Sequence, residues 1–271
     1  MLQEFCNYLR AIRGYSENTI RAYSADLRSF ARWANENRPG TRWSTLQRET
    51  IDEYLEAQCE AGLKATTTNR QLAALSTLFR YFQRQGWILD NPCQYESRRK
   101  QPQTLPTTLK PEQIARAYRR AHGCRRTMLG ILATTGIRIG ELLALNYEDI
   151  DFETSQLRIN GKGSKERIVT STPEVLQTLS DIKRDLKATG RIFYISQRQA
   201  RYMIYETLAP YCQSSHLNPH TIRHTFATEL AKAGENTAAI AKMLGHSHIE
   251  TSQKYINMAE IPTAHKGINL N

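Results

Sequence analysis

The chain of 271 residues carries 37 Lys and Arg against 26 Asp and Glu, a formal net charge of +11. This length suits two domains that each bury a core, and the basic excess favours a partner with negative charge, most commonly nucleic acid, although a merely soluble basic protein has the same composition. Five cysteines, odd in number and never closely spaced, argue against a disulfide framework and a four-cysteine zinc site. The first residues carry charge and lack the apolar core of a signal peptide, and no later apolar run is long enough to span a bilayer. We therefore expect a cytoplasmic protein without a membrane partner.

Apolar residues three and four apart predict a helical module over residues 1–90. Ser16 is typical of a helix N-cap, and glycines punctuate the module. The expected helices are 2–13, 16–36, 48–60 and 66–84.

The N-terminal end of the fourth expected helix carries short polar side chains and two cations: Lys64, Thr66, Thr67, Asn69 and Arg70. Such a set suits DNA phosphates and base edges. A solvated helix cap accounts for the same residues equally well, so both interpretations stay open at this point.

Prolines and few apolar residues mark 91–108 as an extended linker. Its basic triplet, Arg98, Arg99 and Lys100, favours contact with a phosphate backbone over the alternative of a charged linker that is merely kept soluble.

A second, mixed domain is expected over residues 109–271. Two alternating strands, 156–160 and 166–170, are joined by G-K-G-S-K, whose glycines permit a tight reversal and place Lys162 on the turn. The helices expected around them are 111–122, 125–135, 173–187, 198–212, 220–233, 237–244 and 250–257.

One run in this domain, N-P-H-T-I-R-H, predicts a helix start that suits a phosphate. Asn218 is the expected N-cap and Pro219 the first helical residue, so His220 lies in the first turn beside exposed backbone N–H groups. Arg223 and His224 follow three and four positions later on the same face.

The pair of His220 and His224 is also compatible with a zinc site. Thr and Ile follow His220, however, so the Glu of the zinc-protease motif is absent, and no third ligand has suitable spacing. We predict no metal and no cofactor.

Five features stand in a fixed order: T-G-I-R-I-G-E-L at 135–142, G-K-G-S-K-E-R at 161–167, H-T-I-R-H at 220–224, L-G-H-S at 244–247, and Tyr255. Together they resemble the tyrosine recombinase family, the phage-integrase and Xer-like site-specific DNA recombinases. The helical module resembles that family's core-site-binding domain, so the resemblance covers nearly the whole chain.

The resemblance implies that Arg138 and Arg223 clamp the non-bridging oxygens of a scissile phosphate and that His246 hydrogen-bonds to it. Two guanidiniums offer planar forks that match phosphate oxygens and stay charged, so they can stabilise a pentavalent transition state without a metal. Glu141 is expected to orient Arg138 or to cap a helix, and His224 to act as a supporting residue.

Tyr255 is implied as the nucleophile, and His220 as the group that accepts or returns its proton. A phenol with a pKa of about 10 is a weak nucleophile, so a base or a cationic field is needed nearby. Lys162 is implied as the general acid for the leaving 5′ oxygen. Lys165 competes for that role, and Lys162 is preferred because it occupies the glycine-flanked position of the family's motif.

The implied fold is mainly α with a small β-sheet: a helical, SAM-like core-site DNA-binding domain (1–90), a basic linker (91–108) and a mixed α/β catalytic domain with a C-terminal tail (109–271), which form a C-shaped clamp on DNA. The implied reaction cleaves and rejoins DNA through a 3′-phosphotyrosyl intermediate and a Holliday junction, without metal or ATP. The implied partner is double-stranded DNA with inverted-repeat core sites, bound by a homo-tetramer or by a hetero-tetramer with a second recombinase. Arg198 and Arg201 are predicted as further DNA contacts.

Two alternatives remain: a type IB topoisomerase, and a DNA-binding protein with this fold but no catalysis. The complete set of six site residues argues against the second, and the compact helical module argues against the first. The start of the chain at the first core-binding helix favours a simple Xer-like, plasmid or small-element recombinase. After Tyr255 the family's usual Thr-His is replaced by Ile256-Asn257, so docking of the tail in cis or in trans stays open, as does the target sequence.

Overall fold

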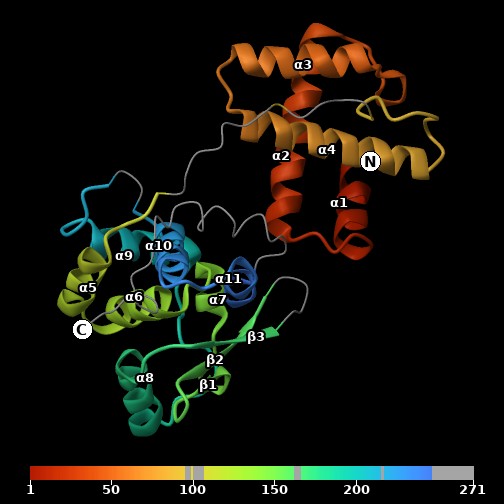
Figure 1. Cartoon of the computed structure of the whole chain (residues 1–271). Coiled ribbons are helices and arrows are strands. Elements are labelled where there is room, and N and C mark those ends of the chain that lie inside the picture. The colour runs from red at the N-terminus through yellow and green to blue at the C-terminus, as the bar shows by residue number, and fades with distance from the viewer. Residues whose placement is uncertain (95–98, 100–106, 162–165, 215–216, 246–271) are drawn as a thin grey trace. The chain divides into compact units, whose positions relative to one another are not determined.

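The computed structural model describes residues 1–94, 99, 107–161, 166–214 and 217–245. The chain forms two compact units, Met1–Gln103 and Thr104–Asn271, and each has its own hydrophobic core (Figure 1). The predicted fold class, mainly helical with a small sheet, is confirmed.

The first unit contains the four helices predicted for it. Their bounds are α1 (Leu2–Ala11), α2 (Glu17–Asn37), α3 (Arg48–Glu60) and α4 (Ala65–Arg84), with a short 3-10 helix, η1 (Trp43–Thr45), before α3. The predicted N-cap is also confirmed, because Ser16 Oγ accepts a hydrogen bond from the Thr19 N–H at 3.3 Å. Helix α4 packs against α2 and α3, and α1 packs against α2.

Aromatic rings fill much of this first core. Phe30 and Tyr54 meet edge to face with their centroids 5.0 Å apart, and Phe79 and Phe82 do so at 5.8 Å. Rings in this geometry add attraction between their edges and faces to the free energy of burial. The first unit is therefore held together by an apolar and aromatic core of its own.

The second unit holds the remaining described elements. They are α5 (Pro111–Arg120), α6 (Gly123–Thr135), α7 (Ile139–Ala144), the 3-10 helix η2 (Tyr147–Asp149), β1 (Ile150–Asp151), β2 (Gln156–Asn160), β3 (Glu166–Thr170), α8 (Pro173–Leu186), α9 (Gln197–Leu208), α10 (Pro219–Lys232) and α11 (Thr237–Leu244).

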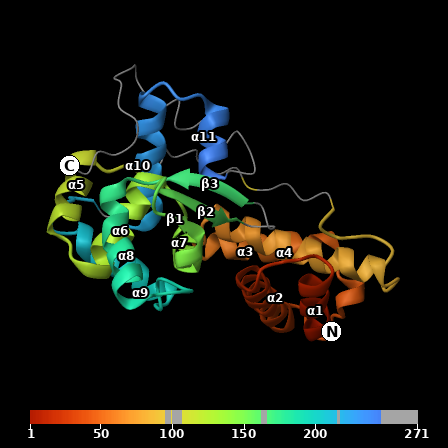
Figure 2. The same cartoon turned by 90° about the horizontal axis from the view of Figure 1, so that it is seen from below.

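Helix α6 is the centre of the second unit, and α5, α8, α9 and α10 pack around it (Figure 2). Its middle residues are buried on all sides, which explains why its apolar pattern is nearly continuous. Gly130 lies at the tightest point: a Cβ there would be 2.8 Å from Tyr118 Cε2 and 2.9 Å from Val175 Cγ1. Helix α6 thus provides a fixed support for the chain that leaves its C-terminus.

The predicted hairpin is confirmed, and β2 pairs with β3 from Asn160↔Glu166 to Gln156↔Thr170. A third antiparallel strand, β1, lies on the other edge of β2, and α11 packs against β3. Neither β1 nor α7 was predicted. Both are too short to show a hydrophobic period, since β1 has 2 residues and α7 has 6.

The expected helix 198–212 ends earlier, at Leu208. Pro210 follows two residues later, and its nitrogen has no hydrogen with which to continue the helical hydrogen bonds.

Candidate active site

The start of α10 is formed as the sequence predicts. Asn218 Oδ1 accepts hydrogen bonds from the N–H groups of His220 (2.9 Å) and Thr221 (3.2 Å), and Pro219 is the first helical residue. The cap fixes His220 in the first turn and places Arg223 one turn further along α10.

Arg223 is buried, with 4% of its surface exposed. Its Nη1 donates to the Gly136 carbonyl and its Nη2 to the Leu244 carbonyl, each at 2.7 Å. The guanidinium therefore joins the C-terminal ends of α6 and α11. These two hydrogen bonds fix the direction of the guanidinium plane.

The turn after α6 depends on Gly136, which has φ +62°. A Cβ at this position would collide with the ring of Phe226 on α10 and lie 3.0 Å from Leu244 Cδ2. Glycine is thus required both for the left-handed backbone and for the close approach of α10 and α11.

Arg138 follows this turn as the N-cap residue of α7. Its Nη1 donates to Glu141 Oε1 at 3.0 Å and its Nη2 to the Gly245 carbonyl at 3.2 Å, while its backbone N–H donates to Glu141 Oε2 at 2.8 Å. Glu141 thus has both of the roles expected for it: it caps α7 and orients Arg138. With 39% of its side chain exposed, Arg138 faces solvent more than Arg223 does.

A third arginine, Arg167 on β3, also binds Glu141, and the sequence interpretation did not assign it a role. Its Nη1 and Nη2 donate to the two carboxylate oxygens at 3.1 and 2.8 Å. Its position in the G-K-G-S-K-E-R motif was the available signal, but nothing in the motif indicates which carboxylate it pairs with.

Glu141 stays ionised in this environment. Burial acts to raise the pKa of its carboxyl, but hydrogen bonds from Arg167 and from the Arg138 N–H, together with both positive charges, outweigh burial and hold the pKa below its usual range.

His220 stays neutral for a related reason. The pKa of its imidazole is lowered first by partial burial of the ring and then by the positive charges of Arg223, Arg201 and Arg138. The residue as a whole still counts as exposed, so solvent screens these charges in part. A neutral imidazole at physiological pH can accept a proton.

Arg138, Glu141, Arg167 and His220 line an open cleft of about 1390 Å³, all of whose lining residues belong to the second unit. The basic and titratable residues of its lining are Arg138, Glu141, Arg158, Glu166, Arg167, His220 and Lys242. Basic groups outnumber the two carboxylates, so the cleft favours an anionic ligand.

Two comparisons with family models cover this cleft and the helical module. The phage integrase family model matches residues 107–260, and the model of the phage integrase N-terminal SAM-like domain matches residues 2–86. The chain belongs to the phage integrase family. It is an Xer-like tyrosine recombinase.

Similarity to curated tyrosine recombinases extends over the full length. The chain is 31% identical to tyrosine recombinase XerC of Mycobacterium sp. (strain KMS), over 98% of this chain and 97% of the relative. It is 29% identical to tyrosine recombinase XerD of Haemophilus influenzae, over 96% and 94%.

Solved tyrosine recombinase structures share the fold. A XerH recombinase bound to a palindromic difH substrate after cleavage superposes with a TM-score of 0.77 at 21% identity, covering 96% of this chain and 81% of that chain. A lambda integrase dimer bound to a COC′ core site superposes with a TM-score of 0.68 at 17% identity, covering 94% and 75%.

Three of the six predicted catalytic residues of this recombinase lie outside the described residues: Lys162, His246 and Tyr255. Of the other three, Arg138 and His220 line the cleft, and Arg223 is buried close enough for its charge to act on His220. His224 follows Arg223 on α10 and is half-buried.

The predicted DNA contacts of the first unit cluster at the start of α4. Lys64 and Thr66 are exposed there, and Thr67 is half-buried. Arg70 forms a fork on Asp26, with Nε–Oδ2 at 2.8 Å and Nη2–Oδ1 at 2.9 Å.

Asn69 ties α4 to the predicted linker. Its side-chain amide donates to the Arg99 carbonyl at 2.9 Å and accepts from the Arg99 N–H at 2.8 Å. Arg98 and Lys100, the other two members of the basic triplet, lie outside the described residues.

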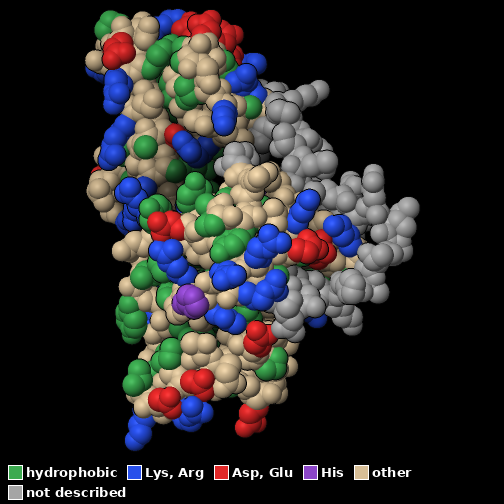
Figure 3. Space-filling model, turned by 90° about the vertical axis from the view of Figure 1, so that its left-hand side faces the viewer, with side chains coloured by type: hydrophobic (Ala, Val, Ile, Leu, Met, Phe, Trp, Pro, Cys, Tyr) green, Lys and Arg blue, Asp and Glu red, His purple; other side chains and the backbone are tan. Residues whose placement is uncertain are grey.

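In the second unit, Arg198 and Arg201 are both exposed on α9, with the exposed ring of Tyr202 beside them in sequence. The face of the recombinase on which α5 lies also carries a gathering of Lys and Arg side chains (Figure 3). Exposed arginines of α5, namely Arg116, Arg119 and Arg120, belong to this unit's basic surface.

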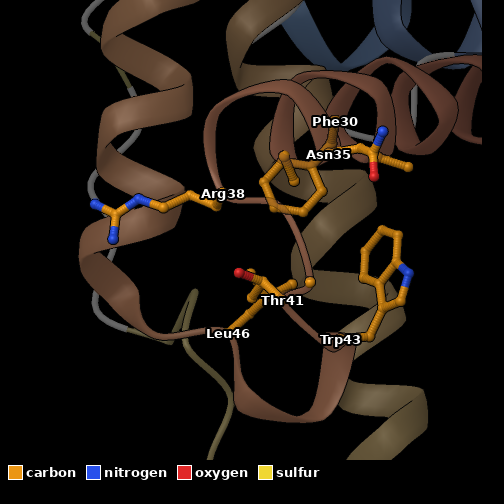
Figure 4. A pocket seen from close by; sticks show the side chains of 9 residues that line it. Phe30, Asn35, Arg38, Thr41, Trp43 and Leu46 are labelled. Atoms are coloured by element: carbon orange, nitrogen blue, oxygen red, sulfur yellow. The ribbon is translucent and has the colours of Figure 1, made fainter.

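A smaller pocket of about 180 Å³ lies in the first unit, between the end of α2 and η1 (Figure 4). Phe30 and Trp43 form its apolar wall, and Arg38 lies at its edge. It contains no carboxylate and no histidine, so it offers no acid or base.

Within the described ranges, no helix is long and apolar enough to cross a membrane. No group of three His, Cys, Asp or Glu side chains among those residues is arranged to hold a metal ion.

Proposed function

We propose that the chain cleaves and rejoins DNA strands at specific sites through a covalent 3′-phosphotyrosyl link to Tyr255. One observation carries the proposal: Arg138 and Arg223, far apart in sequence, donate to the adjacent carbonyls of Gly245 and Leu244, which brings both guanidiniums to the end of α11. Arg138 lines the cleft, and Arg223 is buried. Two adjacent guanidiniums match the non-bridging oxygens of one phosphate.

In the proposed reaction the Tyr255 hydroxyl oxygen attacks the scissile phosphorus, and the bond from phosphorus to the 5′ oxygen breaks. The phenolic proton passes to His220, which is neutral at physiological pH because its pKa is lowered. Lys162 gives a proton to the leaving 5′ oxygen. His246 donates a hydrogen bond to the phosphate beside the two arginines, while Glu141 and His224 support them.

The 3′-phosphotyrosyl link conserves the energy of the phosphodiester bond, so a 5′ hydroxyl can attack it and reverse the cleavage without ATP. The two guanidiniums provide the positive charge that the transition state requires, and the proposal therefore includes no metal and no cofactor. Attack by a partner strand's 5′ hydroxyl gives a Holliday junction.

The proposed DNA contacts come from three places. Lys64, Thr66, Thr67, Asn69 and Arg70 form the first group, the triplet Arg98, Arg99 and Lys100 the second, and Arg198 and Arg201 the third. The first group belongs to a core-site-binding domain of residues 1–90, the second to a linker of 91–108, and the third to a catalytic domain of 109–271. All carry donors suited to phosphates and base edges.

The proposed substrate is double-stranded DNA with two inverted core sites, bound in the cytoplasm by four subunits. The XerH structure with a palindromic substrate supports binding to inverted sites, and the lambda integrase dimer on a core site supports binding by more than one subunit. Each subunit then acts on one strand, which is what exchange through a junction requires.

A nicked suicide substrate tests the proposal. The target site for this substrate is identified by selecting bound DNA from a random pool and then mapping where the DNA is cleaved. Wild type is expected to form a covalent protein–DNA complex and then recombinants, whereas Tyr255→Phe binds the same DNA and forms no complex. Absence of a complex with wild type, or cleavage by Tyr255→Phe, contradicts the proposal. A complex without recombinants indicates a topoisomerase.

A further inference from the structure

Arg167 makes contacts that a salt bridge needed only for folding does not require. Its two terminal nitrogens bind both oxygens of Glu141, and its Nε donates to the Met243 carbonyl at 3.0 Å. Only 12% of its side chain is exposed, against 8% for Glu141. One side chain of β3 thus contacts α7 and the end of α11.

Glu141 is shared between two arginines. Its Oε1 accepts from Arg138 Nη1 at 3.0 Å and from Arg167 Nη1 at 3.1 Å. Because Arg167 donates a hydrogen bond to each oxygen of Glu141, this carboxylate has one fixed orientation. The Arg138 guanidinium bound to it is fixed as well.

The end of α11 is held by the same set of arginines. The consecutive carbonyls of Met243, Leu244 and Gly245 accept from three different side chains: Arg167, Arg223 and Arg138. The C-terminal end of a helix carries partial negative charge, which three cations stabilise. Gly245 packs closely on Arg167, because a Cβ there would lie 3.0 Å from Arg167 Nη1.

We infer that Arg167 is a positioning residue of the proposed phosphate clamp: it fixes Arg138 through Glu141 and fastens the end of α11, on which both clamp arginines rest, to β3. The inference rests on the proposed function. Arg167 acts through Arg138, and its own donors are directed to Glu141 and Met243. Lysine cannot replace it, since a point charge on a flexible stem cannot bind two carboxylate oxygens and a carbonyl in fixed directions.

The test compares two substrates in single-turnover strand cleavage at saturating protein. One has a normal scissile phosphate, and the other has a neutral methylphosphonate there, which removes the charge that Arg138 is proposed to stabilise. The proteins are wild type, Arg138→Ala, Arg167→Lys and, as a matched control, Arg125→Lys. Arg125 also pairs with a glutamate of another helix, Glu206, at 2.7 Å, but lies outside the cleft.

Arg167→Lys is expected to cleave the normal substrate about 100-fold more slowly than wild type, as misplacement of a distant supporting residue can cause. On the methylphosphonate substrate the difference in cleavage rate between Arg167→Lys and wild type is smaller. The same holds for Arg138→Ala, because both variants lose the same interaction with the phosphate charge. Arg125→Lys stays close to wild type on both substrates.

Two results overturn the inference alone. The first is cleavage by Arg167→Lys at the rate of Arg125→Lys. The second is an equal loss of cleavage rate by Arg167→Lys on both substrates with a lowered melting temperature, which indicates that Arg167 supports only the fold. If wild type cleaves neither substrate, the proposed function falls, and this inference falls with it.

Discussion

Asp26 in the first unit and Glu141 in the second are both carboxylates buried against arginine, but they bind different numbers of arginines. In the first unit Asp26, with 6% of its side chain exposed, pairs with one arginine among the described residues, Arg70, whose side chain is 47% exposed. In the second unit Glu141 serves both Arg138 and Arg167, while Arg223 is held by backbone carbonyls. The first pair is neutral, whereas the second set has surplus positive charge beside a cleft.

The two sets therefore differ in their balance of charge: Asp26 and Arg70 neutralise each other, whereas the set around Glu141 keeps positive charge. Asp26 on α2 and Arg70 on α4 join two helices whose packing an aromatic core already secures. Glu141 carries one negative charge and binds the two guanidiniums of Arg138 and Arg167, so this set keeps a positive charge that an anionic ligand can balance.

The largest expected effect is that of Arg223→Lys, compared with Arg70→Lys. Lysine at this position removes one of the two guanidiniums of the proposed phosphate clamp, which slows cleavage by about 100- to 1000-fold. Arg70→Lys leaves single-turnover cleavage at saturating protein near the wild-type rate, because saturation removes any change in DNA affinity. Equal deficits in the two variants would erase the proposed distinction between the units.

Next comes Glu141→Gln, compared with Asp26→Asn. Removing the charge of Glu141 leaves the buried Arg167 without a counter-ion, so the free energy of unfolding falls by about 3 kcal/mol. In Asp26→Asn, water can solvate the guanidinium of Arg70, so the free energy of unfolding falls by only about 1 kcal/mol. Urea unfolding measures both. Trp33, Trp43 and Trp87 all lie in the first unit, so tryptophan fluorescence follows that unit and circular dichroism follows the two together.

The stability difference between wild type and Glu141→Gln is expected to depend on pH. The pKa of Glu141 is lowered in the folded chain, so its contribution to stability is present above the unfolded pKa of about 4.3 and is lost as the pH falls through the folded pKa. Wild type and Glu141→Gln should therefore converge in stability on acidification. A gap that stays constant with pH would show that the carboxylate charge contributes nothing.

Gly136→Ala follows with a smaller effect. A methyl group there meets Phe226 and imposes φ +62° on an L-residue, which costs about 2 kcal/mol of stability and, by shifting the carbonyl that Arg223 binds, slows cleavage. Gly62→Ala in the first unit is the control: its φ is +78° but nothing lies within 4 Å, so only about 1 kcal/mol is lost. Matching losses in thermal unfolding would contradict the close packing of α10 on this turn.

The smallest effects are those of two helix caps, Asn218→Ala and Ser16→Ala. Each removes a side-chain acceptor from an N-terminus and costs about 1 kcal/mol. Only Asn218→Ala should slow cleavage, because α10 carries His220 and Arg223. If Ser16→Ala slows cleavage equally at saturating protein, the cap effect is one of global stability.

Much of the local structure followed from short-range rules. Asn218 with Pro219 predicted the start of α10, and Ser16 predicted that of α2, because caps act on neighbouring residues. Glu141, three residues after Arg138, was expected to orient it for the same reason. The short elements α7 and β1 were missed because they have no measurable period.

The amino-acid sequence is enough to identify the candidate residues: two arginines in separate motifs, a capped histidine and a glycine-flanked hairpin. Which of these groups share a partner depends on tertiary packing. Arg167 meets Glu141 across β3 and α7, and three arginines meet consecutive carbonyls at the end of α11. These bonds depend on how helices and strands pack around α6, and spacing along the chain carries no information on the direction of a side chain between elements.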